Sequence, residues 1–359
     1  MRILMISFQE LNEFAHGGVK GTIKNYKALS SFGNVDLYSV KKSNTLLSML
    51  SLVEGNISPV LFKHIKEVMK LYKEWKYDFV FLDHSALGIF AKKLKTAFPE
   101  CKVVTTYRNC ELDYIDVRFE KSQKFRKWIF KRRVKKAEEA GTKYADVRVV
   151  LTQRDQTRIE ELYGIKPEII IPQSMDDVFN ATDLLPEEEH KKQVLLFGPA
   201  GSANLEAFSW FVDNISPYIN ATTVIAGKGM DAQKERFAHE YTEVIGYVND
   251  IGKMYASVDC VVIPLKKGGG MKFKTAEAMM FGKYIFGTRE AFEGYDIDMT
   301  SFSEEYEEPN DYITAINSFL RDNRRFYQAS RDCFLENYSN EGNQKRYKQI
   351  IDTILRTEV

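Results

Sequence analysis

Cysteine and histidine are scarce in this sequence, with four Cys and five His among 359 residues. The cysteines stand at positions 101, 110, 260 and 333, without the short spacings of a metal site. A scattered set of this kind favours a reducing, intracellular compartment over a disulfide-bonded secreted one. We therefore expect a cytoplasmic protein.

Long apolar runs and an excess of charge of either sign are also missing. No stretch of about 18 apolar residues occurs, so we expect no membrane-spanning helix. Lys and Arg number 51 and Asp and Glu 50, and the formal net charge of +1 argues against a general nucleic-acid-binding protein. The segment Met1 to Phe8 is too short for a signal peptide and is typical of a first β-strand. The chain is longer than most domains with a single hydrophobic core, which predicts two domains.

One stretch of the chain combines a strand, a glycine loop and a helix. Val258 to Leu265 is an apolar run typical of a buried parallel strand, and a helical pattern covers Met271 to Phe281. The glycines between them allow a tight turn and a close approach to a ligand. A helix start attracts anions, and Lys272 and Lys274 add two positive charges there. The pattern indicates a phosphate site, although an ordinary turn with solvated lysines stays an alternative.

The order of residues in this stretch resembles a known signature. Gly268-x-Gly270-x-Lys272-x-Lys274-x-x-Glu277, with Glu293-Gly294 further on, is similar to the donor site of GT4-type retaining glycosyltransferases of the GT-B fold (glycosyl transferases group 1). The resemblance implies an α/β protein with two Rossmann-like domains that face each other across a cleft. The expected parts are an N-terminal acceptor domain at 1–174 completed by about 343–359, a linker at 175–192, and a C-terminal donor domain at 193–342.

The resemblance also implies roles for residues of the donor site. Lys272 and Lys274 would neutralise the leaving diphosphate, and Glu277 would accept hydrogen bonds from the ribose. The donor would be a nucleotide sugar, UDP- or GDP-linked, with no cofactor and no metal. The implied donor-side residues are Gly17, Gly18, Gly198, Gly246, Tyr247, Gly268, Gly269, Gly270, Met271, Lys272, Lys274, Thr275 and Glu277.

The candidate acceptor side follows strands of the first half. Ligands of open α/β sheets bind beyond the carboxyl ends of strands, which selects His84, Arg108, Asn109 and Glu111. The resemblance adds His16, in the loop before Gly17-Gly18. Arg108 stands where the family usually has histidine. Because arginine does not act as a base near neutral pH, we interpret Arg108 as a clamp for a negative charge.

Two further features of the sequence concern how the sugar is bound and whether a metal site is present. Gly269 occupies the place of the first of two family glutamates, which leaves open how the transferred sugar is held. Asp296-Ile-Asp298 has Asp-x-Asp spacing, but it lacks a preceding strand, so a metal role is disfavoured.

The segment Lys121 to Lys136 carries nine Lys and Arg residues with aromatic residues among them. It predicts a basic amphipathic helix, which can lie on an anionic membrane surface. The alternative is a solvated helix with its aromatic face in the core. The last part of the chain, 311–359, reads as helical, with breaks near Asn337 and Gly342. Its final apolar spacing suits packing onto the first domain.

The resemblance thus implies a retaining, metal-independent, hexosyltransferase-like enzyme. We expect it in the cytoplasm, and the basic helix leaves a peripheral position at the inner face of the membrane as an alternative. It would transfer sugar from a nucleotide sugar to a glycan, lipid-linked or protein acceptor, in bacterial cell-surface glycan or glycoconjugate synthesis. A catalytically silent partner or binding subunit and a nucleotide-sugar epimerase are the alternatives. Scarce histidine disfavours the epimerase, which needs an acid and a base around the sugar.

Overall fold

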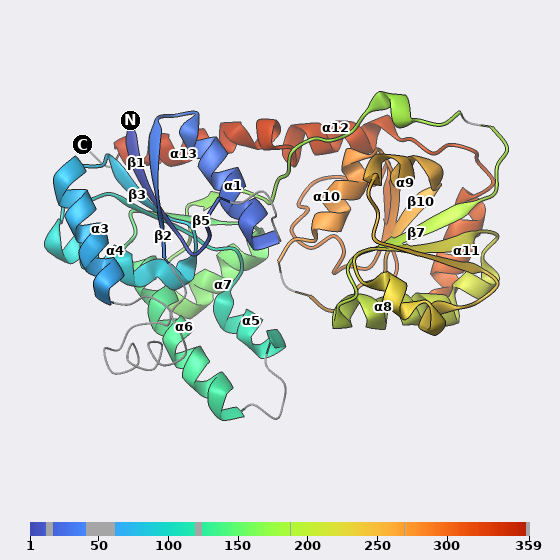
Figure 1. The fold of residues 1–359 in the computed structure, drawn as a ribbon, viewed down its shortest axis with the longest axis horizontal. Helices are drawn as coiled ribbons and strands as arrows, with labels where there is room; N and C mark the ends of the chain where they lie inside the picture. Colours follow the sequence, from blue (N-terminus) through green and yellow to red (C-terminus); the bar gives the residue numbers. More distant parts are fainter. Residues whose placement is uncertain (12–16, 41–61, 119–123, 187, 269, 357–359) are drawn as a thin grey trace. The chain divides into compact units, whose positions relative to one another are not determined.

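The computed structural model describes residues 1–11, 17–40, 62–118, 124–186, 188–268 and 270–356. The chain divides into two compact units (Figure 1). Unit 1 comprises Met1–Met175 and Asn343–Val359, and unit 2 comprises Asp176–Gly342. Among the described residues, no helix is long and apolar enough to cross a membrane.

Unit 1 is built on a six-stranded parallel sheet of order β2-β1-β3-β4-β5-β6. Its inner strands are short, buried and mostly apolar, as parallel sheets require, although Thr105, Thr106 and Arg148 also lie in them. The strands are β1 (Arg2–Ser7), β2 (Asn34–Ser39), β3 (Phe79–Leu82), β4 (Val103–Thr106), β5 (Val147–Val150) and β6 (Ile169–Ile170).

Helices cover both faces of this sheet. On one face Val68 and Leu94 of α3 and α4 pack against Leu4 and Val80. On the other face, residues of α1 and of the last helix, α13, contact β1 and β5. The helices of this unit are α1 (Gly17–Ser30), α3 (Phe62–Trp75), η1 (Ser85–Leu87), α4 (Gly88–Ala97), α5 (Glu111–Arg118), α6 (Lys124–Tyr144) and α7 (Gln153–Tyr163), while α13 (Asn340–Arg356) begins in unit 2 and continues into unit 1.

Unit 2 repeats the architecture, with a parallel sheet of order β12-β11-β10-β7-β8-β9. The strands are β7 (Gln193–Phe197), β8 (Thr222–Ala226), β9 (Thr242–Gly246), β10 (Cys260–Ile263), β11 (Tyr284–Gly287) and β12 (Ser303–Glu305). The α-helices are α8 (Ser202–Asn214), α9 (Ile251–Ser257), α10 (Phe273–Met280), α11 (Pro309–Phe319) and α12 (Gln328–Asn337). Short 3-10 helices are η3 (Ala181–Asp183), η4 (Ser216–Tyr218), η5 (Met230–Gln233) and η6 (Glu235–Phe237).

The expected break near Asn337 is confirmed, because α12 ends at Asn337 and α13 begins at Asn340. A second break, which the sequence did not predict, lies between α11 and α12, where Tyr327 N donates to Gly282 O at 2.7 Å. Gly342, expected near a break, lies inside α13, where an added Cβ would stand 2.3 Å from Leu335 O. Both details arise from contacts between segments, which the local pattern does not contain.

The helix after the glycine loop also begins later than predicted, at Phe273 instead of Met271. Gly270 has a positive φ of 60°, which favours glycine, and Lys272 has an extended backbone before the first helical turn. Lys272 is therefore the residue that precedes α10, and Lys274 lies in its first turn.

Candidate functional site

The candidate donor site is a pocket of about 480 Å³ in unit 2. It lies beyond the carboxyl ends of β7 and β10, at the edge where open α/β sheets bind ligands. The loop after β7, the loop after β10 and the first turns of α10 line it. Of the predicted donor residues, those that line the pocket are Gly198, Gly268, Met271, Lys272, Lys274 and Glu277.

Lys274 is held inside this pocket by a residue in the first turn of α8, the helix that follows β7. Its Nζ donates to Asn204 Oδ1 at 2.7 Å and lies 5.4 Å from the ring centre of Phe208. Burial of the ammonium group lowers the pKa of Lys274 to about 7, with Glu277 acting in the opposite direction. A bound diphosphate would supply the negative charge that keeps this lysine protonated.

The side chains of Asn204 and Lys274 lie close to the place that a side chain at Gly198 would take. An added Cβ there would lie 2.7 Å from Asn204 Nδ2 and 3.0 Å from Lys274 Nζ. Glycine at this strand end therefore allows the lysine and the asparagine to approach the loop after β7.

Lys272 is engaged differently from Lys274. Its Nζ donates to Gly270 O at 2.6 Å and lies 2.5 Å from Glu290 Oε1. Glu290 follows β11, so this ion pair joins the glycine loop to the loop of the neighbouring strand. A Cβ at Gly268 would stand 2.7 Å from Lys272 Cε, which explains the glycine at that position.

Two predicted residues of α10 make contacts inside unit 2. Glu277 lines the pocket and accepts a hydrogen bond from Tyr255 Oη at 3.3 Å. Thr275 is fully buried, and its Oγ1 donates to Ala291 O at 2.7 Å. The Thr275 hydroxyl thus anchors the loop after β11. Gly269, one of the predicted donor-side residues, lies outside the described residues.

Two predicted donor-side residues, Gly246 and Tyr247, are not among the residues that line this pocket. Gly246 ends β9 with a φ of 82°, and its carbonyl accepts a hydrogen bond from Gly227 N at 2.7 Å. Tyr247 follows it and is 67% exposed. The exposed ring of Tyr247 offers a surface for stacking, but it is not part of the lining of the pocket.

In unit 1, Arg108 belongs to a network around a buried carboxylate. Asp83, which follows β3, is fully buried, and its Oδ2 lies 2.7 Å from Arg108 Nη2. Oδ2 also accepts from Ser7 Oγ at 2.8 Å and Thr22 Oγ1 at 2.6 Å, and Oδ1 accepts from Asn25 Nδ2 at 2.6 Å. The negative charge that Arg108 clamps in this structure is therefore Asp83, a partner that the sequence analysis did not identify.

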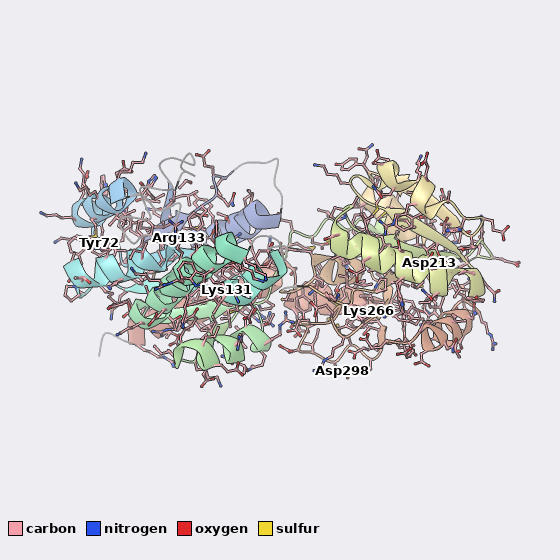
Figure 2. All side chains as sticks on the ribbon, turned by 90° about the horizontal axis from the view of Figure 1, so that it is seen from below. Tyr72, Lys131, Arg133, Asp213, Lys266 and Asp298 are labelled. Atoms are coloured by element: carbon pink, nitrogen blue, oxygen red, sulfur yellow. The ribbon has the colours of Figure 1, made fainter. Side chains whose placement is uncertain are left out.

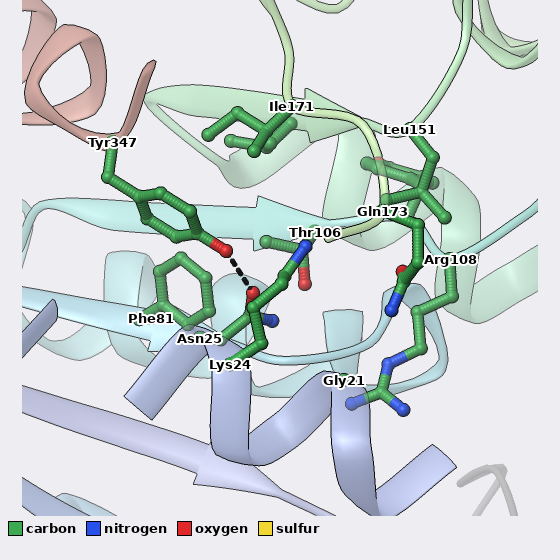
Figure 3. Close-up of a pocket in the computed structure, with 12 residues that line it drawn as sticks. Gly21, Lys24, Asn25, Phe81, Thr106, Arg108, Leu151, Ile171, Gln173 and Tyr347 are labelled. Atoms are coloured by element: carbon green, nitrogen blue, oxygen red, sulfur yellow. Dashed lines mark hydrogen bonds between the residues drawn. The ribbon is translucent and has the colours of Figure 1, made fainter. Parts of the chain in front are cut away.

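A small pocket of about 20 Å³ lies beside this network, also within unit 1 (Figure 3). Lys24 and Arg108 both line it, and Tyr347 of α13 donates to Asn25 next to it. Burial, with a smaller effect of Arg108, lowers the pKa of Lys24 to about 7. The volume suits about one water molecule and excludes a sugar. The signal in the sequence is the polar face of α1, on which Asn25 lies one turn after Gly21 and Thr22.

The remaining candidate acceptor residues form a second cluster in unit 1. Glu111 Oε1 accepts from Asn109 Nδ2 at 2.8 Å and lies 3.3 Å from His84 Nε2. His84 Nδ1 accepts from Ala86 N at 3.1 Å, which assigns the ring proton to Nε2, facing the carboxylate. The structure brings these three residues together as one polar group. His16 lies outside the described residues, and Gly17 and Gly18 form the start of α1.

No group of three or more His, Cys, Asp or Glu side chains that could hold a metal converges within the described part of the chain. Asp298 lies at the edge of unit 2 (Figure 2), where its Oδ1 accepts from Thr300 N and Oγ1.

The predicted basic helix is present as α6, which begins at Lys124 and runs on to Tyr144. Its aromatic residues are not all in the core: Trp128 is 52% exposed and Phe130 37%. Arg132 lies one turn from Trp128, with its guanidinium 5.1 Å from the ring centre. Figure 2 shows Lys131 and Arg133 along the same helix. The alternative of an aromatic face buried in the core is therefore wrong for Trp128 and Phe130. Residues 121–123 of the predicted segment lie outside the described residues.

Comparison with known proteins identifies the domain that holds the donor pocket. Residues 191–322 match the family model described as glycosyl transferases group 1. These residues lie within unit 2, which therefore contains a glycosyl transferases group 1 domain. No curated protein matches the chain.

Solved structures share the fold of the whole chain. Sucrose-phosphate synthase from Thermosynechococcus elongatus has 13% sequence identity over 99% of both chains, with a TM-score of 0.73. The lipopolysaccharide outer core galactosyltransferase WaaB has 14% identity over 100% of both chains, with a TM-score of 0.70. Anabaena HepE in complex with UDP-glucose has 13% identity over 98% of this chain and 99% of its own, with a TM-score of 0.63. These likenesses, with the two parallel six-stranded sheets, confirm the predicted GT-B fold.

Proposed function

We propose that this protein is a glycosyltransferase that moves a sugar from a nucleotide-diphosphate sugar to a hydroxyl group of an acceptor. The observation that carries the proposal is the half-buried Lys274 at the start of α10, inside a pocket of the glycosyl transferases group 1 domain. The departing diphosphate develops negative charge as the glycosidic bond breaks. A lysine and helix-start amides positioned for that charge stabilise the transition state, usually the largest catalytic contribution.

The donor is proposed to be a UDP sugar. Anabaena HepE has the same fold and is described in complexes with UDP and with UDP-glucose. Lys274 would contact the diphosphate, and Glu277 would bind the ribose. In this scheme the lysine and the helix dipole neutralise the diphosphate, so that catalysis needs no metal ion. Retention at the anomeric carbon is proposed from the resemblance to retaining enzymes.

We propose that the acceptor binds unit 1. We also propose that the enzyme acts in bacterial cell-surface glycan synthesis. WaaB, a protein of the same fold, is described as a lipopolysaccharide outer core galactosyltransferase. The polar group of His84, Asn109 and Glu111 provides hydrogen-bonding atoms suited to sugar hydroxyls. We propose that α6 holds the enzyme at the inner, anionic face of the membrane, where lipid-linked acceptors are presented.

The decisive experiment measures thermal stabilisation by a panel of nucleotides and nucleotide sugars, because a ligand that binds the native state raises its apparent stability. Lys274→Ala is compared with Lys234→Ala, a change of an exposed lysine between η5 and η6 of the same unit. A shift with one base family that is lost only in Lys274→Ala supports the proposal. No shift with any member contradicts it.

Turnover then separates an enzyme from a silent partner. The protein is incubated with the nucleotide sugar that binds and with lipid-linked, glycan and peptide acceptors, with and without EDTA. The anomeric configuration of the product is read by NMR. A product with inverted configuration contradicts retention, and inhibition by EDTA contradicts a metal-independent reaction. Binding of the nucleotide sugar without transfer to any acceptor favours the silent partner.

A further inference from the structure

A buried carboxylate on α6 accepts hydrogen bonds from three separate segments of unit 1. Glu138 is fully buried. Its Oε1 accepts from Ser85 Oγ and from Glu111 N, both at 3.0 Å. Its Oε2 accepts from Leu112 N at 3.3 Å and from Tyr163 Oη at 3.1 Å. Each carboxylate oxygen is therefore used twice.

Burying a carboxylate costs free energy of folding, so the presence of Glu138 in the core calls for a physical reason. Burial raises the pKa of Glu138 to about 7, although the hydrogen bond from Glu111 N acts in the opposite direction. A leucine or methionine at this position would fill the space without that cost. What an apolar side chain does not provide is an acceptor for the two backbone N–H groups at the start of α5 and for two hydroxyl groups.

The partners of Glu138 adjoin the polar group that we propose binds the acceptor. Ser85 directly follows His84 in the chain, and Glu111 is the first residue of α5. The side chains of His84 and Glu111 lie 3.3 Å apart. Glu138 accepts hydrogen bonds from the backbone N–H of Glu111 and from the hydroxyl of Ser85, the residue after His84. One carboxylate therefore holds the chain at both halves of the pair.

We propose that Glu138 is a positioning residue that sets the separation and orientation of His84 and Glu111 for acceptor binding. The assignment of this pair to the acceptor rests on the proposed function. The positioning itself does not, because it follows from the hydrogen bonds. Tyr163, on α7, completes the set by fixing the second oxygen of the carboxylate.

The matched test uses Glu138→Gln and its neighbour Glu139→Gln. Glu139 is exposed on the same helix, so the two changes are chemically identical and differ in burial. A glutamine keeps the volume, but its amide nitrogen accepts no hydrogen bond, so one carboxylate oxygen loses its two donors. We expect Glu138→Gln to lower kcat/KM for the acceptor about tenfold or more and to leave nucleotide-sugar affinity within about twofold. Glu139→Gln should change neither value.

Two kinetic results would overturn the proposal. One is an acceptor kcat/KM of Glu138→Gln within about twofold of the wild type. The other is an equal loss of donor affinity in unit 2, which would indicate general destabilisation. If Glu138→Gln does not fold, Tyr163→Phe removes one of the four hydrogen bonds and leaves the charge. It should lower acceptor kcat/KM by a smaller factor without affecting donor affinity, and an unchanged value overturns the proposal.

A readout without turnover keeps this inference separate from the proposed function. NMR of the wild type and both variants follows the His84 ring signals and hydrogen exchange at the amides of Glu111 and Leu112. Glu138→Gln should shift the His84 signals and speed exchange at one or both amides, whereas Glu139→Gln should leave them unchanged. If the protein transfers no sugar but these signals respond, the proposed function fails and the positioning stands. Unchanged signals in Glu138→Gln overturn the positioning.

Discussion

Lys272 and Glu290 form an ion pair within the loops of the donor pocket, with 2.5 Å between Nζ and Oε1. Lys272 Nζ also donates to the carbonyl of Gly270. The positive charge of Lys272 is thus balanced by a carboxylate from the loop after β11, while Lys274 is held by the neutral Asn204. Two lysines two positions apart in the sequence therefore have different electrostatic surroundings.

This pair predicts the effect of Glu290→Gln on donor affinity. The glutamine oxygen still accepts a hydrogen bond from Lys272, but the negative charge is gone, so repulsion of the diphosphate falls. We expect the Kd for the nucleotide sugar to drop several-fold, by about 1 kcal/mol of binding free energy, when measured by calorimetry at low salt. The matched control is Glu308→Gln, an exposed glutamate before α11, which should leave Kd unchanged. Weaker binding in Glu290→Gln would mean that the ion pair is needed to hold the loop.

The pKa of Lys274, about 7, predicts that donor binding depends on pH. Only the protonated lysine attracts the diphosphate, so affinity should be highest below pH 7 and fall as pH rises above it. The limit is about tenfold per pH unit if the bound lysine stays protonated. Calorimetry with a nucleotide sugar between pH 6 and pH 8.5 measures this, because its diphosphate does not titrate there.

Lys274→Arg is the control for this dependence, since arginine keeps its charge throughout the range. The charged or polar side chains facing Lys274 are Asn204, Glu277 and Lys272. The wild type and Lys274→Arg both contain Lys272 and Glu277, so these two residues do not account for a difference between their pH profiles. An equally steep pH profile in Lys274→Arg would assign the effect to another group.

The sequence predicted the strands and the donor loop better than the partners of the site residues. Strands are short buried runs of β-branched and aliphatic residues, and the signature from Gly268 to Glu277 is continuous in the chain, so both are visible locally. The partners of Asp83 are distributed over β1, α1 and the loop after β4, and only folding brings them together. Glu138 and Glu139 are adjacent in a run of charged residues, and the direction of each side chain on α6 distinguishes the buried one from the exposed one.

Three glycine substitutions separate backbone strain from steric overlap. Gly201 has a negative φ and open space around its Cβ position, so Gly201→Ala should leave the free energy of unfolding nearly unchanged. Gly164 also has open space but a φ of 72°, and Gly164→Ala should cost about 1 kcal/mol. Gly282 combines a φ of 61° with Phe326 at 2.3 Å from the added Cβ, and Gly282→Ala should cost about 2–4 kcal/mol. Urea denaturation gives the order, and equal losses for Gly164→Ala and Gly282→Ala would exclude the overlap with Phe326.

The exposed face of α6 predicts salt-sensitive binding to anionic vesicles. Trp128 is 52% exposed beside Arg132, on a helix rich in Lys and Arg. A tryptophan of this kind inserts at the membrane interface while the basic residues attract acidic headgroups. Sedimentation with vesicles that contain phosphatidylglycerol should capture the protein at low salt and release it at high salt, when charges are screened.

Trp75 provides a matched control for Trp128 within the same unit. It is 46% exposed at the end of α3, and the guanidinium of Arg2 lies 4.1 Å from its ring centre. The two tryptophans are thus alike in exposure and in their arginine neighbour, and they differ in the charge of the helix that carries them. Trp128→Ala should weaken vesicle binding several-fold, and Trp75→Ala should not. Equal losses in both variants, or no binding of the wild type at low salt, would show that α6 is not a membrane contact.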